Sequence, residues 1–211
     1  GVVIVILLFT YRSPILWILP ILCSLVALAG ANAVVYVLAK HAGLTVNGQS
    51  AFILTVLVIG AGTDYALLLV ARYREELRQH EDRHEAMAFA LHRASPAIVA
   101  SAATVAIGML CLTLAEMNST AGLGPVLAIG VVVTLLVMLT VLPALLVACG
   151  RWVFWPKRPA FGSQEPTDSG VWARVGTSIS RRPRKVWILT AVALGVVTLG
   201  LVELDASGLT S

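Results

Sequence analysis

The sequence has little charge and few aromatic side chains. Only 12% of its 211 residues are charged and 7% are aromatic, whereas 58% are hydrophobic. In a soluble globular domain about a quarter of the residues are charged. With a mean hydropathy of +0.90, the composition excludes an ordinary soluble domain and favours a chain with largely apolar surroundings.

The sequence is also poor in cysteine. Its three cysteines, Cys23, Cys111 and Cys149, lie in or beside apolar stretches. An odd number in such places gives neither a disulfide framework nor the paired spacing of a zinc site. The net charge of +4 comes from basic residues in loops between apolar stretches. This distribution indicates membrane orientation and not a nucleic-acid partner.

Long apolar runs recur along the whole chain. A helix of about 20 residues, rising 1.5 Å per residue, crosses a hydrocarbon layer of about 30 Å. The sequence therefore predicts an all-α integral membrane protein. Its five predicted complete membrane helices are residues 15–39, 50–73, 96–115, 122–149 and 186–202. Residues 1–10 are too few to span and lack the features of a signal peptide, so we expect the truncated end of another membrane helix.

The polar stretches complete the expected organisation. Residues 75–94 predict a short amphipathic helix along the interface. Residues 150–185, rich in proline and basic side chains, predict a linker with a short helix around 171–179. Of the 15 Lys and Arg residues, all but Lys40 fall on one side. The positive-inside rule makes that side cytoplasmic. We therefore expect a multi-pass protein of the plasma membrane, with residues 72–95 and 150–185 in the cytoplasm.

One carboxylate stands inside a predicted membrane helix. Asp64 is the only acidic residue of the stretch 50–73, and Tyr65 follows it directly. An ionisable group at membrane depth is costly and is by default a functional-site hypothesis. Because a carboxylate can be charged or neutral, its protonation can alter helix packing. Asp64 is therefore predicted to bind and release a proton, and Tyr65 can donate or accept a hydrogen bond. The structural alternative is that Asp64 only joins helices by hydrogen bonds.

Four further residues are candidates to support such a relay. Gly60 lies one helical turn before Asp64 on the same face, and Thr63 lies beside it. On the next predicted helix, Ser101 and Thr104 share a face at a spacing of three and lie at about the depth of Asp64. They could hold the carboxylate or a relay water, although plain helix packing explains the two hydroxyls equally well.

A charged loop contains one motif typical of an enzyme. Residues His80–His84 match H-E-x-x-H, which on a helix puts two imidazoles on one face beside a glutamate base. A zinc site needs a third protein ligand, and the charged neighbourhood offers none that is convincing. A solvated helix face explains the motif, so a zinc hydrolase is a remote alternative and we expect no metal and no cofactor.

The motifs around Asp64 resemble a known family. Residues Gly60–Tyr65, with Leu67–Leu77 after them, resemble the signature helix of the MMPL (mycobacterial membrane protein large) transporters of the resistance–nodulation–division (RND) superfamily. Residues 95–108 and Leu142–Leu146 resemble the same family. The resemblance covers essentially the whole chain, and its most specific part is the helix with Asp64 and Tyr65.

The resemblance implies a fold and a function. The chain would be a partial RND-type helical bundle, spans two to seven of twelve, lacking the second half of the transporter and both extracytoplasmic porter domains. Residues 203–211 would begin the second porter domain. The function implied is export of a lipid or hydrophobic metabolite or drug, driven by the proton-motive force, with Asp64 and Tyr65 at the first of two Asp-Tyr relay positions.

The expected partners are a hydrophobic substrate, protons, membrane lipids and the missing half of the transporter. The chain would then be a secondary active transporter and not an enzyme. The alternative is a sterol-sensing or Patched-like module of the same superfamily, which shares the Gly-x-x-x-Asp pattern of Gly60 and Asp64 but performs no proton-coupled export.

Overall fold

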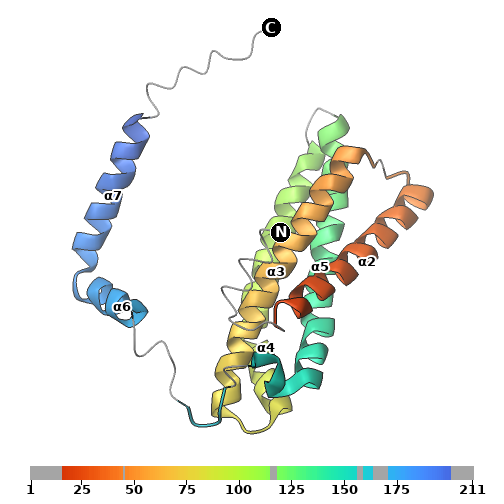
Figure 1. The fold of residues 1–211 in the computed structure, drawn as a ribbon. Helices are drawn as coiled ribbons and strands as arrows, with labels where there is room; N and C mark the ends of the chain where they lie inside the picture. Colours follow the sequence, from red (N-terminus) through yellow and green to blue (C-terminus); the bar gives the residue numbers. More distant parts are fainter. Residues whose placement is uncertain (1–15, 45, 115–117, 156–158, 164–170, 201–211) are drawn as a thin grey trace. The chain divides into compact units, whose positions relative to one another are not determined.

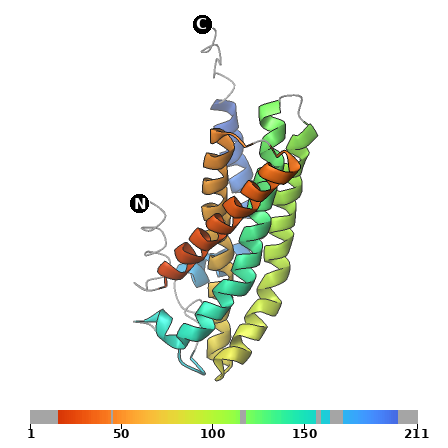
Figure 2. The ribbon, with the colours of Figure 1, turned by 90° about the vertical axis from the view of Figure 1, so that its right-hand side faces the viewer.

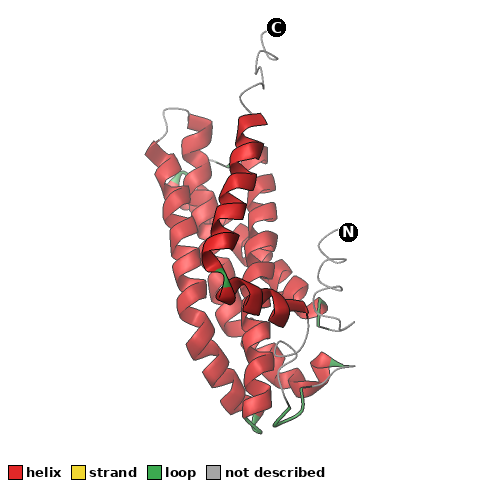
Figure 3. Ribbon diagram, turned by 90° about the vertical axis from the view of Figure 1, so that its left-hand side faces the viewer, coloured by secondary structure: helices red, strands yellow, loops and turns green. Residues whose placement is uncertain are grey.

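The computed structural model describes residues 16–44, 46–114, 118–155, 159–163 and 171–200. These residues form helices joined by short connections, and no strand occurs among them (Figure 3). The chain divides into two compact units, Gly1–Ser163 and Gln164–Ser211. The predicted all-α membrane fold is confirmed, while the truncated helix expected at 1–10 and the tail at 203–211 lie outside the described residues.

Four long helices make up the described bundle of the first unit: α2 (Ile18–Ala42), α3 (Gly48–Gln79), α4 (Arg83–Cys111) and α5 (Asn118–Cys149). In Figures 1 and 2 they run along one another, with α2 inclined across α3 and α5. Each is long and apolar enough to cross a membrane, with mean hydropathies from 2.1 to 2.8. The chain is therefore a multi-pass membrane protein.

Local sequence fixes where these helices begin and end. Gly43 ends α2 in the left-handed conformation, with φ of 67°, which glycine adopts without steric cost. Asn47 caps α3, where its Oδ1 accepts from the Ser50 amide at 2.7 Å and Ser50 Oγ accepts from the Asn47 amide at 3.0 Å. Asp82 caps α4 by accepting from the His84 amide at 2.7 Å. These caps satisfy amide groups that the first helical turns leave without partners.

The core of the bundle lies between α3 and its neighbours. Buried residues of α3 such as Leu54, Val58 and Leu69 pack against α2, α4 and α5. The most exposed of the four helices is α4: only 11% of its apolar membrane-spanning stretch is buried, compared with 33–39% of the same stretch in the other three helices. The described helices of the bundle thus leave most of this stretch of α4 uncovered.

The structure corrects the short interfacial helix predicted over residues 75–94. Residues 75–79 are the end of α3, and residues 83–94 are the beginning of α4, which continues through Pro96. Of the apolar side chains in this segment, Met87 is buried between the helices, whereas Phe89 is 42% exposed. The predicted segment is therefore the junction of two bundle helices, and its contact with the membrane interface stays a prediction.

A short 3₁₀ helix, η2 (Gly150–Phe154), closes the same end of the bundle. Arg151 Nη2 donates to the backbone carbonyls of His80 at 2.8 Å and Glu81 at 3.0 Å. Arg151 Nη1 donates to the Pro159 carbonyl at 3.0 Å. One guanidinium thereby fastens the chain after α5 to the turn between α3 and α4.

The second unit contains α6 (Val171–Arg181) and α7 (Pro183–Gly200), which contact each other. The short helix expected around 171–179 corresponds to α6. Proline at the first position of α7 suits a helix start, because its missing amide would be unpaired there anyway. The membrane span expected at 186–202 stays a prediction. Four of the described helices are long and apolar enough to cross a membrane, and α7 is not one of them.

Candidate functional site

Asp64 lies at the middle of α3 on an exposed face of the bundle. Gly60, one turn earlier, is exposed on the same face, and a methyl group there would meet no atom within 4 Å. The opposite face of the helix carries buried residues such as Val58 and Leu69. Asp64 therefore points away from the core that these four helices share.

Tyr65 lies on the buried side of α3, with 5% of its surface exposed. The Ser101 hydroxyl of α4 and the carboxylate of Asp64 both lie close enough to influence the Tyr65 hydroxyl. Three of the six predicted site residues, Asp64, Tyr65 and Ser101, are thus brought together across the contact between α3 and α4. Hydroxyls can both accept and donate hydrogen bonds, which is the chemistry that a proton relay near a carboxylate needs.

The other two hydroxyls at the site are engaged within their own helices. Thr63 Oγ1 donates to the carbonyls of Ile59 at 2.9 Å and Gly60 at 2.8 Å. Thr104 Oγ1 donates to the Ala100 carbonyl at 2.8 Å. Neither hydroxyl proton is directed to Asp64 in this structure, so the support predicted from these two residues stays a prediction.

Sequence reasoning missed the structural role of Gly62. A methyl group at this buried position would lie 2.6 Å from Ser24 Oγ of α2 and 2.9 Å from Met138 Cε of α5. Ser24 is itself fixed by a 2.8 Å hydrogen bond to the Pro20 carbonyl. Gly62 therefore lets three helices approach closely beside Asp64. The only sequence signal for this was its place between small residues.

A second carboxylate, Glu76, is completely buried near the C-terminal end of α3. Its Oε1 lies 3.0 Å from Arg93 Nη1 of α4, and its Oε2 lies 3.4 Å from His80 Nδ1. The contacts are at ion-pair distance but lack hydrogen-bond geometry, since neither oxygen has a hydrogen-bond partner in the described structure. The signal available in the sequence was that Glu76 lies seven residues after Leu69, on the buried stripe of α3.

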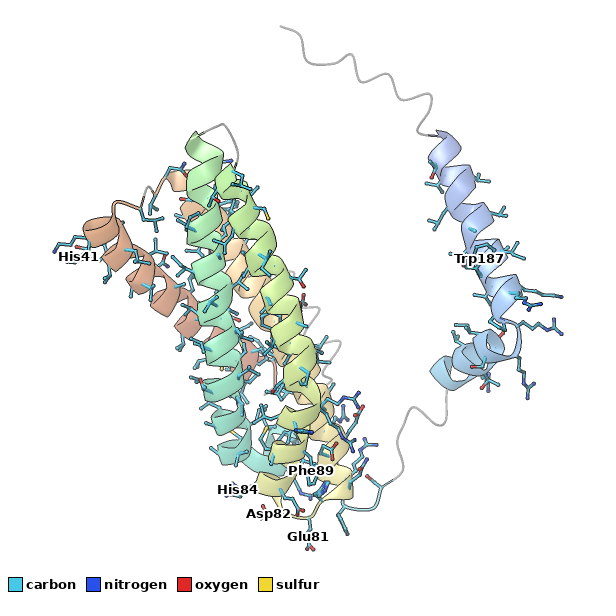
Figure 4. All side chains as sticks on the ribbon, turned by 180° about the vertical axis from the view of Figure 1, so that it is seen from behind. His41, Glu81, Asp82, His84, Phe89 and Trp187 are labelled. Atoms are coloured by element: carbon cyan, nitrogen blue, oxygen red, sulfur yellow. The ribbon has the colours of Figure 1, made fainter. Side chains whose placement is uncertain are left out.

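The residues of the H-E-x-x-H motif do not share a helix face, which corrects the geometry expected for them. His80 caps the C-terminal end of α3, whereas His84 lies in the first turn of α4. The His80 ring stacks on Phe89 with centroids 4.5 Å apart. In Figure 4 the labelled Glu81, Asp82 and His84 lie around the turn at the end of the bundle. A zinc peptidase motif needs both histidines on one continuous helix, and here a turn separates them.

Comparison with known proteins shows which family the chain resembles. A family model described as the MMPL family matches residues 1–186. The chain is 62% identical over 208 residues to the membrane protein ActII-3 of Streptomyces coelicolor, covering 99% of this chain and 29% of that protein.

Two more distant relatives have names that state an activity. The chain is 34% identical to the apo-petrobactin exporter of Bacillus anthracis, covering 92% of this chain and 28% of that protein. It is 35% identical to the sulfolipid-1 exporter MmpL8 of Mycobacterium tuberculosis, covering 92% of this chain and 17% of that protein. The chain therefore spans less than a third of the length of each of these relatives.

Proposed function

This chain belongs to the MMPL family, and from that membership we propose that it is the membrane bundle of one half of a proton-driven exporter. Relatives are named transport proteins and exporters, which supports transport and not enzyme chemistry. One relative is named for a sulfolipid, so a lipid or another hydrophobic small molecule is the proposed substrate class. The remaining length of such a transporter would supply the substrate-binding domains.

The observation that carries this proposal is the exposed position of Asp64 at the middle of α3. Insertion of a charged carboxylate at the centre of a membrane helix costs roughly 2.5–3.5 kcal/mol. The face with Gly60 and Asp64 is therefore expected to meet protein or water and not lipid tails. The match covers only 29% of ActII-3, so the rest of such a protein is available to cover this face.

Protonation supplies the coupling step in this proposal. When Asp64 binds a proton its charge is lost, and the cost of placing it against an apolar surface falls. The neutral and charged states then favour different packing of this face of α3. Tyr65 and Ser101, which lie close enough to influence each other, would offer a proton route between α3 and α4.

Replacement of Asp64 by asparagine tests the proposal, because the side chain keeps its shape and loses its titration. In the full-length transporter in proteoliposomes with an inward proton gradient, Asp64→Asn is expected to abolish proton uptake and substrate efflux together. Asp82→Asn is the matched control. Asparagine caps a helix as well as aspartate, so this control is expected to transport normally.

Circular dichroism must show that both variants are folded. If folded Asp64→Asn still transports, Asp64 does not couple proton uptake to efflux, and its carboxylate has only a structural role. Efflux that survives without proton uptake would contradict proton coupling alone. The sterol-sensing alternative predicts a response to sterol with no proton flux in the unmodified protein.

A further inference from the structure

The helix α6 has one apolar face that the described residues of its own unit leave uncovered. Val175 and Ile179 stand one helical turn apart and are exposed, and in the sequence Val171 precedes them at the same spacing. The other side of the helix carries Thr177 and Ser180. Such a division of apolar and polar faces over three turns is typical of a helix lying at a membrane surface.

The charge of this segment is of one sign. Five basic residues occur between Val171 and Lys185, and no acidic residue occurs from Val171 to Val202. The five are Arg174, Arg181, Arg182, Arg184 and Lys185. All are exposed within this unit, so none of their charges is buried by its described residues. The partner that complements this segment must therefore be both anionic and apolar.

The basic residues lie between α6 and the apolar helix α7. From Trp187 onward α7 exposes apolar side chains along its length, with Trp187 71% and Leu189 73% exposed; Figure 4 marks Trp187 on this helix. The two helices contact each other, and α7 begins at Pro183. The basic cluster thus occupies the junction between an amphipathic helix and an apolar one, where a membrane surface would lie.

We propose that α6, with the basic residues through Lys185, docks on the anionic phospholipid surface of the membrane. The apolar face of α6 would enter the headgroup boundary while the guanidinium groups bind lipid phosphates. Each basic residue near an anionic surface contributes about 1 kcal/mol to such binding. This docking is independent of the proton relay and would hold the entry to α7 at a fixed depth.

Fluorescent labels on the two faces of α6 test the proposal in the complete 211-residue chain. Cys23, Cys111 and Cys149 are replaced by serine, and an environment-sensitive dye is attached to Ile179→Cys or to Thr177→Cys. The protein is reconstituted in vesicles of phosphatidylcholine alone or of phosphatidylcholine and phosphatidylglycerol in equal parts. These symmetric vesicles make the result independent of protein orientation.

The label at residue 179 is expected to show blue-shifted emission in the vesicles with phosphatidylglycerol and water-like emission in phosphatidylcholine alone. The label at residue 177 is expected to report water in both. Adding Arg181→Gln and Arg182→Gln is expected to lower the ratio of docked to free helix about 30-fold, from the loss of two charges near the surface. Adding Lys40→Gln and Arg72→Gln removes the same charge elsewhere and is expected to change nothing.

Water-like emission from residue 179 in both vesicles would overturn the docking. Equal blue shifts in both would also overturn it, because they would place the apolar face against protein or neutral lipid without any charge recognition. A failure of the relay variant Asp64→Asn to affect transport would leave this result untouched, so the two proposals are separable.

Discussion

At the scale of single residues, two glycines of α3 differ in what surrounds them. A methyl group at Gly62 would lie 2.6 Å from Ser24 Oγ and 2.9 Å from Met138 Cε, whereas one at Gly60 would meet nothing within 4 Å. We expect Gly62→Ala to lower the free energy of unfolding by about 1–2 kcal/mol, since overpacking outweighs the better helix propensity of alanine. Gly60→Ala is expected to raise it by up to about 1 kcal/mol. Thermal unfolding in detergent, followed by circular dichroism, measures both.

The double variant Ser24→Ala with Gly62→Ala provides the control for this comparison. Removing the Ser24 hydroxyl removes the closer of the two obstructing atoms, so part of the lost stability should return. If Gly62→Ala is as stable as the unmodified chain, α2 and α3 are not in the close contact described. A larger loss from Gly60→Ala than from Gly62→Ala would reverse the assignment of the two faces.

At the scale of helices, the pair of Glu76 and Arg93 joins the ends of α3 and α4. Glu76 is fully buried, and its Oε1 lies 3.0 Å from Arg93 Nη1. Removing one member of a fully buried pair costs about 3–5 kcal/mol. Because half of the Arg93 side chain is exposed, we expect Arg93→Gln to cost roughly 2 kcal/mol in the free energy of unfolding.

A double-mutant cycle separates this pair from ordinary loss of packing. Once Glu76→Gln has removed the buried charge, Arg93→Gln should cost much less than it does alone. The exposed pair of Arg72 and Glu75 is the control: at 2.6 Å it is shorter, yet Arg72→Gln is expected to cost no more than about 0.5 kcal/mol. Additive losses in the cycle, or a larger effect at Arg72, would mean that burial does not decide the strength of these pairs.

At the scale of the whole molecule, apolar run length predicted the four bundle helices, because hydropathy over about 20 residues is a local property of the sequence. The end of the bundle was predicted less well. The charged residues between Arg72 and Arg93 resemble a surface segment, and only the packing of α3 on α4 shows that Glu76 and Met87 are buried. At the site, Asp64 was evident from the sequence as an isolated charge. Which hydroxyl of α4 lies near Tyr65, Ser101 or Thr104, depends on how α4 is rotated about its axis, and the sequence does not give that rotation.

The sidedness of the molecule is the last expectation, and it rests on charge alone. His41 and Glu81 are exposed at opposite ends of the bundle (Figure 4). Near His41 the only basic side chain of that loop is Lys40, whereas the segment around Glu81 is rich in arginine. Since loops with many Lys and Arg residues stay in the cytoplasm, a cysteine at residue 41 should face outward and one at residue 81 inward.

A membrane-impermeant maleimide tests this in cells producing single-cysteine variants, with the native cysteines replaced by serine because Cys111 and Cys149 are exposed. His41→Cys is expected to react in intact cells, and Glu81→Cys only after the membrane is opened. The opposite pattern would invert the bundle, and with it the side from which protons reach Asp64. Reaction of both variants in intact cells would mean that the chain inserts in two orientations, so that the charge asymmetry alone does not orient it.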